Sequence, residues 1–360
     1  MRTDYDVIVV GCGPAGSSTA EHAALGGASV LVLEKKKNVG EPVACGEFMP
    51  LLEEMEAILP NSPDLGPLFD VPESLISRRM DIFRILSPNR HWDVPFKGYT
   101  TDRDRFDKHL AEKARKAGAE IATSAQVIDV NGTEVRTRDA TYRAKVVVGA
   151  DGPVSKVAAC LGLPKNQDPY PAITAQAEGD FEPIMEMHFG SVAPGAYAWV
   201  LPKGKGANVG VGVARRWADG KLTDYFDAYL KQRGLNIVTR PIGKYVPSKG
   251  PLDRTVAEHG LLVGDAAGHV MAVNGGGIPI AMICGRLAGR VAAEHVAKGV
   301  PLSRYEDLWR HQVAKPLRTA VHTKMLADLF FGSNRRLEFS MNVLGARRMG
   351  NILRCRPSFP

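Results

Sequence analysis

The sequence predicts an α/β protein, α+β overall, in which a parallel-sheet unit is joined to an antiparallel sheet and to C-terminal helices. Three observations favour this fold class. Residues 6–35 read as strand, glycine-rich turn, helix and strand, the order typical of a doubly wound parallel sheet. Residues 256–294 again read as strand, turn and long helix. Residues 184–213 contain three short strand patterns, which are typical of an antiparallel meander.

The first unit carries the pattern of a Rossmann-like dinucleotide site. An apolar run, Val7–Val10, predicts a buried strand, and Gly11, Gly13 and Gly16 follow it with the spacing G-x-G-x-x-G. The first glycine permits a sharp turn, the second lets a pyrophosphate approach the backbone, and the third lets helix and strand pack closely. The helix N-terminus offers free N–H groups to the phosphates. Glu34 ends the second strand, 18 residues after the last glycine, where its carboxylate can accept hydrogen bonds from a ribose.

A second glycine-rich turn distinguishes between two cofactors. Leu261–Val263 predicts a strand, and the Gly264 and Asp265 that follow it place a carboxylate where it can bind a polyhydroxyl chain such as ribityl. Gly275–Gly277 open the next helix, whose backbone amides can meet the anionic edge of a reduced isoalloxazine. A plain glycine-rich turn would not explain why two segments suited to bind phosphate or hydroxyl groups lie about 250 residues apart in the sequence. The sequence therefore favours FAD over NAD.

Two further segments agree with this nucleotide-binding unit. Residues 100–118 begin with polar capping residues and continue as an amphipathic helix. Residues 146–158 contain a buried strand that ends at Asp151 and Gly152.

The segment APGAYAWVLPKG, residues 193–204, places two aromatic side chains in one strand. Tyr197 and Trp199 lie two residues apart, so they point to the same face. Two interpretations stay open. An isolated pair of this kind is usually a core pair that packs against a helix. The small residues beside the pair instead suit the wall of a site for a flat or apolar ligand.

Length and composition limit the function classes. The 360 residues are enough for more than one domain, and 44% hydrophobic and 24% charged residues are ordinary for a globular protein. The sequence contains no apolar stretch that would span a membrane, and its N-terminus enters a strand without a signal or transit peptide, so we expect a cytoplasmic protein. Five scattered cysteines without a CxxC pair indicate neither a disulfide framework nor a zinc site, and no metal is expected.

The net charge of +7 is concentrated at the C-terminus. Residues 335–360 contain six arginines and one acid, Glu338, which gives +5 over 26 residues. This segment is either a solvated basic helix that closes the fold or a surface that meets anionic lipid head groups. No nucleic acid is expected as a partner, because no DNA- or RNA-binding motif accompanies the charge. The interleaved apolar residues are Leu337, Phe339, Met341, Val343, Leu344, Met349, Ile352 and Leu353.

Several motifs taken together resemble known flavoproteins. The glycine-rich start with Glu34, the element Arg103–Asp107, the sequence GADG at 149–152 and the pair Gly264-Asp265 resemble the para-hydroxybenzoate-hydroxylase-type flavoproteins. Three further motifs resemble the geranylgeranyl reductase family, especially its archaeal digeranylgeranylglycerophospholipid reductases. They are CGE at 45–47, the segment 190–204 and NGGGI at 274–278. The resemblance covers about residues 4–300, with Leu201 where the family's aromatic motif commonly has Phe.

The resemblance implies three regions and a set of cofactor contacts. A discontinuous FAD-binding domain is expected at 1–80, 100–168 and 251–295, an antiparallel-sheet substrate domain at 81–99 and 169–250, and a C-terminal helical region with a basic tail at 296–360. The implied FAD contacts are Gly11, Gly13, Pro14, Ala15, Gly16, Glu34, Lys35, Cys45, Gly46, Arg103, Val127, Asp151, Gly152, Gly264, Asp265, Gly275, Gly276, Gly277 and Ile278.

The resemblance also implies a reaction, the FAD-dependent hydrogenation of isolated C=C bonds in geranylgeranyl chains of diether lipid precursors. Such a bond is not polarised, so protonation is expected to lead, and a hydride from flavin N5 then quenches the cationic carbon. Tyr197 and Trp199 would stabilise that cation and, with Pro202, line the tunnel of the polyprenyl lipid. Cys45 is either the proton donor or a small buried hydrophobe, and His269 and Tyr197 are weaker candidates for the donor.

The source of electrons and the reaction class leave alternatives open. The chain has no second G-x-G-x-x-G, so we expect an external donor: NAD(P)H, ferredoxin or a deazaflavin. A flavin-dependent monooxygenase or halogenase is an alternative on the same scaffold, and an FAD-binding sensor without turnover is another. Peripheral contact with the inner face of the cell membrane is expected from the basic tail.

Overall fold

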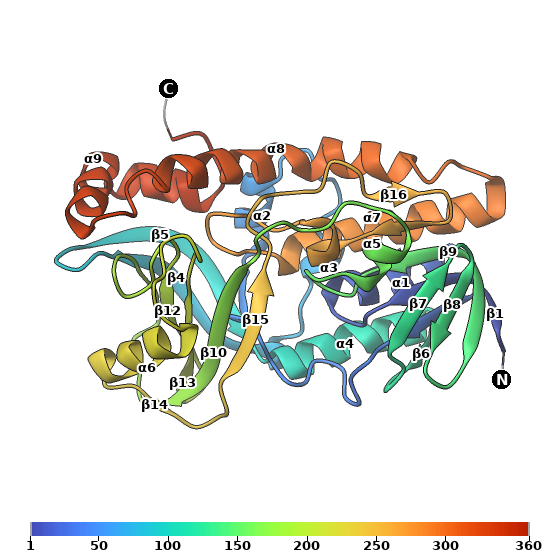
Figure 1. Ribbon diagram of the computed structural model, residues 1–360, viewed down its shortest axis with the longest axis horizontal. Helices are drawn as coiled ribbons and strands as arrows, with labels where there is room; N and C mark the ends of the chain where they lie inside the picture. The colour runs from blue at the N-terminus through green and yellow to red at the C-terminus, as the bar shows by residue number, and fades with distance from the viewer. Residues whose placement is uncertain (1, 359–360) are drawn as a thin grey trace.

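The computed structural model describes residues 2–358 and places two β-sheets side by side beneath a layer of long helices (Figure 1). The mixed fold class predicted from the sequence is confirmed. Met1, at the start of the expected first domain, and Phe359 and Pro360, at the end of the basic tail, lie outside the described residues.

The first sheet has a parallel core at the N-terminal unit. Val7 of its central strand pairs with Val30 on one side and with Val146 on the other. The residues of that strand from Val7 onward are buried, because helices or strands cover both faces of the sheet. The parallel strands are, in order, β17 (Gly260–Leu262), β9 (Thr141–Gly149), β1 (Asp4–Val10), β2 (Val30–Leu33) and β6 (Glu120–Ala122). The antiparallel additions are β16 (Val256–Ala257), β7 (Val127–Asn131) and β8 (Glu134–Thr137).

Two helices cover one face of this sheet in close contact with each other. They are α1 (Pro14–Leu25) and α7 (Ile278–Lys298), and α4 (Arg103–Lys116) lies beside α1. A Cβ at Gly285 would lie 2.5 Å from the Ala15 carbonyl oxygen, and one at Gly289 would lie 2.3 Å from the Thr19 carbonyl oxygen. Because only glycine leaves room at these points, the two helix backbones touch, and the first turn of α1 lies against α7 at Gly285.

The second sheet is the largely antiparallel one. Its strands β11, β12 and β13 form the predicted meander. Strand β3 pairs with β5 in this sheet, although its residues fall in the segment 1–80 expected for the first domain. The strands lie in the order β14 (Asn236–Ile237), β10 (Tyr170–Glu178), β13 (Gly206–Gly212), β12 (Ala198–Lys203), β11 (Ile184–His188), β4 (Ile76–Leu86), β5 (His91–Thr101) and β3 (Phe48–Pro50), with β15 (Ile242–Val246) also on β10.

Two C-terminal helices span both sheets. Helix α8 (Arg304–Ala327) packs on α7, and α9 (Asn334–Leu353) continues over β5 (Figure 1). Gly345 breaks α9, because its φ of +61° lies outside the helical region. Among residues 2–358, no helix is long and apolar enough to cross a bilayer. The shorter helices are α2 (Leu52–Ile58), α3 (Gly66–Phe69), α5 (Lys156–Cys160) and α6 (Leu222–Arg233), with single 3-10 turns η1 (Glu73–Leu75) and η2 (Gly264–Ala267).

Candidate active site

One cavity of about 1390 Å³ receives side chains from both sheets and from the C-terminal helices. Its volume exceeds the roughly 300–1,000 Å³ typical of a pocket for one small ligand. The first turns of α1 and α7 lie at one part of its wall, and strands β4, β5, β10 and β12 supply another part. The cavity therefore has room for a dinucleotide together with a second molecule.

Most of the residues expected to contact the cofactor line this cavity. Gly16 and Gly264 are the exceptions, because neither lines the cavity. A Cβ at Gly16 would lie 1.9 Å from the Gly11 carbonyl oxygen, and one at Gly264 would lie 2.8 Å from the Ala15 Cβ. These two glycines lie behind the cavity wall, where they let neighbouring segments of the chain pack closely. The lining residues are Gly11, Gly13, Pro14, Ala15, Glu34, Lys35, Cys45, Gly46, Arg103, Val127, Asp151, Gly152, Asp265, Gly275, Gly276, Gly277 and Ile278.

The turn before α1 has the geometry of a pyrophosphate cradle. Gly11 has φ +101°, and a Cβ there would lie 2.4 Å from the Ala150 carbonyl oxygen. A Cβ at Gly13 would meet no atom within 4 Å, so this glycine leaves open space at the cavity. Helix α1 has no side-chain cap and no acidic residue in its first turn, so its N–H groups and positive dipole end remain available to an anion.

Helix α7 presents a second uncapped N-terminus to the same cavity. Its N-cap is Gly277, no side chain caps it, and no acidic residue lies in its first turn. The aspartate at the end of the neighbouring strand, Asp265, also lines the cavity. Two positive helix ends and a polyol-binding carboxylate in one cavity fit the pyrophosphate, isoalloxazine and ribityl groups of FAD.

Glu34 is held rigidly at the end of β2. Its side chain accepts hydrogen bonds from the backbone N–H of Cys12 at 2.8 Å and from that of Lys36 at 2.9 Å, one on each oxygen. Each carboxylate oxygen keeps a further acceptor position. Because Glu34 also lines the cavity, the ribose contact expected from the sequence fits this geometry.

Two other charged residues of the motifs make structural contacts beside the cavity. Asp151 accepts hydrogen bonds from the Ser155 hydroxyl at 2.6 Å and from the Lys156 backbone N–H at 2.7 Å, so it holds the turn before α5. Burial raises the pKa of Asp151 against the lowering effect of these bonds. Arg103 forms a two-pronged ion pair with Asp107, with both N–O distances at 2.9 Å.

The aromatic pair lies on the cavity face of the second sheet. The Tyr197 and Trp199 rings meet edge to face, with their centroids 6.0 Å apart, and both line the cavity. Burial raises the pKa of Tyr197, whose hydroxyl donates to the Asn274 carbonyl oxygen at 2.5 Å. Pro202 was expected in the tunnel wall, and it does not line this cavity. The strand alternates, so Leu201 lines the cavity while Pro202 points to the other face.

The three candidates for proton donor lie in different environments. Cys45 lines the cavity, and the backbone N–H of Glu47 donates to its sulfur at 3.3 Å. The other thiols of the chain take no part in this wall. His269 lies outside the cavity lining, fully buried against Trp309 with ring centroids 4.7 Å apart. Burial lowers the pKa of His269 to about 3, so its imidazole is neutral near neutral pH and is a poor acid.

Much of the apolar wall was not singled out from the sequence. Alternation within strands was the available signal, because Phe83 and Ile85 are two residues apart in β4 and both line the cavity. The eight apolar residues named above for the basic tail line the cavity as well, so α9 acts as its cover. Glu47, between Gly46 and β3, was noted only as part of the CGE motif. The other wall residues that we had not named include Phe96, Met187, Phe189, Phe330 and Phe331.

The fold and the paired glycine-rich turns at one cavity define a flavoprotein of the FAD-dependent oxidoreductase class. A myxobacterial chondrochloren halogenase, described as FAD-dependent, shares the fold with a TM-score of 0.72 at 19% identity, over 91% of this chain and 83% of that one. A geranylgeranyl bacteriochlorophyll reductase-like protein from Thermoplasma acidophilum is more similar, with a TM-score of 0.82 and 27% identity over 95% and 92% of the two chains.

Sequence comparison places the chain within a family. Residues 170–245 match the geranylgeranyl reductase catalytic domain. The digeranylgeranylglycerophospholipid reductase of Methanococcus aeolicus is 32% identical over 92% of this chain and 88% of its own length. That of Methanosarcina acetivorans is 36% identical over 86% and 81%. The chain therefore belongs to the geranylgeranyl reductase family, as its motifs indicated.

The Glu34 contacts predict a specific loss of cofactor. The purified protein is expected to be yellow and to release FAD on denaturation, and Glu34→Ala should raise the Kd for FAD at least tenfold. A hydrogen bond to a charged acceptor contributes about 1.5–3 kcal/mol, and the variant also leaves buried N–H groups unpaired. Fluorescence titration of the apoprotein measures this Kd. Glu258→Ala, at an exposed carboxylate, is the matched control. Release of FMN or NAD, or an unchanged Kd in Glu34→Ala, contradicts the assignment.

Proposed function

We propose that this chain is an FAD-dependent reductase that hydrogenates isolated C=C bonds of geranylgeranyl chains in diether lipid precursors. The observation that carries the proposal is the shared cavity, in which two uncapped helix N-termini and a long apolar wall with Tyr197 and Trp199 lie in one continuous space. The names of the relatives in the methanogens point to the same substrate class. A polyprenyl chain needs this apolar surface, and a dinucleotide needs the helix ends.

The cavity wall suits a reaction with cationic character. Reduced FAD, when bound, supplies a hydride equivalent. The faces of Tyr197 and Trp199 stabilise positive charge on the tertiary carbon of a protonated double bond, by about 0.5–2 kcal/mol each in a dry site. The apolar side chains around them exclude the water that would trap such a centre as an alcohol. The electrons come from an external donor: NAD(P)H, ferredoxin or a deazaflavin.

Cys45 is the proton donor in this proposal. Its sulfur accepts a hydrogen bond from the Glu47 N–H, which leaves its own S–H free to point into the cavity. The Tyr197 hydroxyl already donates its proton to the Asn274 carbonyl oxygen. His269 is neutral and lies away from the cavity lining.

Mass spectrometry of the lipid product tests the reaction class. A geranylgeranyl diether lipid incubated anaerobically with the holoprotein and a chemical reductant should gain two hydrogens per reduced bond. Boiled holoprotein with the same reductant is the control for reduction without the enzyme. A lipid that gains oxygen in air would instead indicate the monooxygenase alternative, and one that gains halogen in air with added halide would indicate the halogenase alternative. A lipid that never changes would indicate a binding protein without turnover.

The aromatic pair predicts a graded series at Trp199. Trp199→Phe and Trp199→Leu both lose the hydrogen bond that the indole Nε1–H donates to Asn208, so their difference isolates the π face. Trp199→Phe should retain about tenfold more turnover than Trp199→Leu, since a desolvated cation–π contact contributes about 0.5–2 kcal/mol. Turnover per bound FAD is the measurement. Equal turnover in the two variants would show that the aromatic ring is only a packing wall.

We also propose that the mouth of the cavity meets an anionic membrane. Leu329, Phe339 and Val343 line the cavity and yet are 68%, 67% and 57% exposed, which is unusual for large apolar side chains. Arg347 and Arg348 of α9 are exposed and lie close to Phe339 and Val343 in the sequence. Arg335 and Arg336 are exposed as well. Such a rim would let a lipid chain pass from a bilayer into the cavity while arginines bind head groups.

Two tail arginines have other partners and are not part of this surface. Arg354 forms a two-pronged ion pair with Glu54, with N–O distances of 2.6 and 2.7 Å. Arg356 donates to the Ala57 carbonyl oxygen at 2.9 Å. The charge available to lipid is therefore smaller than the +5 of the whole segment suggests.

Liposome co-sedimentation tests the membrane contact. Arg347→Gln/Arg348→Gln should weaken binding to anionic vesicles by about 2 kcal/mol, because each basic residue near the surface contributes about 1 kcal/mol. Added salt should also weaken binding to anionic vesicles. The control Arg105→Gln/Arg115→Gln removes two exposed arginines of α4, which lies on the opposite side of the molecule from α9 (Figure 1). Equal binding of both double variants, or equal binding to neutral vesicles, would overturn the electrostatic contact.

A further inference from the structure

A buried carboxylate, Glu47, lies in the cavity wall two residues after Cys45. Only 1% of Glu47 is exposed, and its φ of +64° lies in the left-handed region. A residue other than glycine is strained in this region, and the conformation persists only where surrounding contacts hold it. The contacts of the Glu47 carboxylate provide that hold.

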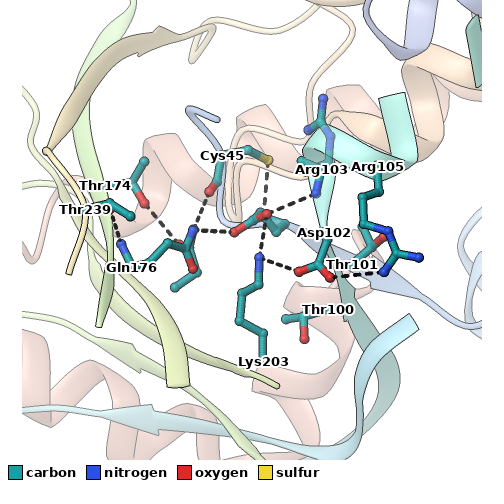
Figure 2. A network of polar contacts seen from close by, with 12 residues as sticks. Cys45, Thr100, Thr101, Asp102, Arg103, Arg105, Thr174, Gln176, Lys203 and Thr239 are labelled. Atoms are coloured by element: carbon teal, nitrogen blue, oxygen red, sulfur yellow. Dashed lines mark hydrogen bonds and ion pairs between the residues drawn. The ribbon is translucent and has the colours of Figure 1, made fainter. Parts of the chain in front are cut away.

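Four hydrogen-bond donors from separate elements converge on the Glu47 carboxylate. One oxygen accepts from the backbone N–H of Arg103 at 3.1 Å and from the Lys203 ammonium at 2.9 Å. The other accepts from the Gln176 amide at 2.7 Å and from the Asn208 amide at 2.8 Å. Figure 2 shows Gln176, Lys203 and Arg103 approaching this point from different strands and from the start of α4. Four donors fill the acceptor positions of a carboxylate, so Glu47 is a fixed acceptor.

Asn208 connects the fixed Glu47 carboxylate to Cys45 and Trp199 in the cavity wall. Its amide nitrogen donates to Glu47 and to the Cys45 carbonyl oxygen, both at 2.8 Å. Its amide oxygen accepts from the Trp199 indole Nε1–H at 2.7 Å, and the Thr174 hydroxyl lies at 3.0 Å. A carboxylate and a carbonyl can only accept, and an indole N–H can only donate, so the Asn208 amide has one permitted orientation.

The charge of Glu47 is compensated by one lysine. Lys203 lies 2.9 Å from Glu47 and 2.9 Å from Asp102, and its side chain is 15% exposed. Burial disfavours the ammonium, but the two carboxylates outweigh that effect and hold the pKa of Lys203 above its ordinary value. Removal of one partner from a buried pair of this kind destabilises the folded protein, since the remaining charge is left uncompensated.

We propose that Glu47 is a positioning residue, which acts through Asn208 to fix the Trp199 indole and the Cys45 carbonyl in the cavity wall. The Glu47 carboxylate is the side-chain acceptor that holds the nitrogen end of the Asn208 amide, and it acts together with the Cys45 carbonyl oxygen. The proposal rests on the proposed function only in assigning Trp199 and Cys45 to the reaction. The geometry that it describes is independent of the substrate.

The indole N–H resonances of the holoprotein test the positioning directly. The chain has four tryptophans, and Trp199→Phe identifies the Trp199 cross-peak by its disappearance from a ¹⁵N-correlated spectrum. Glu47→Gln keeps the size of the side chain but places an amide N–H₂ among the four donors, so the contact with Asn208 should weaken, Asn208 should shift, and the Trp199 cross-peak should move or broaden. The Trp309 cross-peak, from a buried indole bonded to Thr255, should stay in place. Asp102→Asn, which changes the other carboxylate on Lys203, is the matched control and should leave Trp199 unmoved.

Steady-state kinetics provides a second readout, the split between kcat and KM. A purely structural role for Glu47 would not lower kcat while leaving KM unchanged. Glu47→Gln should lower kcat about tenfold to a hundredfold, because small misplacements of reacting groups have effects of this size, while KM stays within about twofold. If Glu47→Gln fails to retain FAD, Gln176→Met removes a single donor to Glu47 and should move the same cross-peak. An unmoved Trp199 cross-peak in whichever of these two variants retains FAD overturns the positioning role. Because the spectrum needs no substrate, it also separates this failure from a failure of the proposed function.

Discussion

The close contact between α1 and α7 is the constraint on which the site depends. Gly285 and Gly289 let α7 approach the backbone of α1 at Ala15 and Thr19, and no larger residue would fit there. The contact brings two uncapped N-termini, separated by more than 250 residues of sequence, to one cavity. A dinucleotide with an anionic pyrophosphate and a flavin ring can then bind across both helix ends. A shift of either helix would separate the two halves of the cofactor site.

The second sheet gives this cofactor site its chemical character. Its cavity face carries Tyr197, Trp199 and Leu201, and α9 covers the same space with the apolar side of a basic segment. Flavin-dependent halogenases share the fold, so the parallel sheet and its helices do not determine the reaction. In the proposed function, the reaction class depends on the cavity wall formed by the second sheet. There, Glu47 of the CGE segment 45–47 is connected through Asn208 to the indole of Trp199.

The local parts of the site could be predicted from the sequence, and the parts that depend on tertiary contacts could not. The G-x-G-x-x-G turn and Glu34 are readable because turn, helix dipole and strand end are set by neighbouring residues. Strand alternation should have favoured Leu201 over Pro202, since Leu201 shares the face of Trp199. The inward face of α9 was not predictable, because the helix could cover a cavity or a membrane with the same residues. The four donors around Glu47 come from distant strands, which no local pattern brings together.

Anaerobic mixing of the reduced holoprotein with a geranylgeranyl diether lipid tests the central claim, that cofactor and lipid chain share one cavity and react there. The account predicts that the absorbance of oxidised flavin returns without oxygen and that one double bond is lost per flavin reoxidised. Flavin that stays reduced in the presence of the lipid, and is reoxidised only when oxygen is admitted, would contradict it.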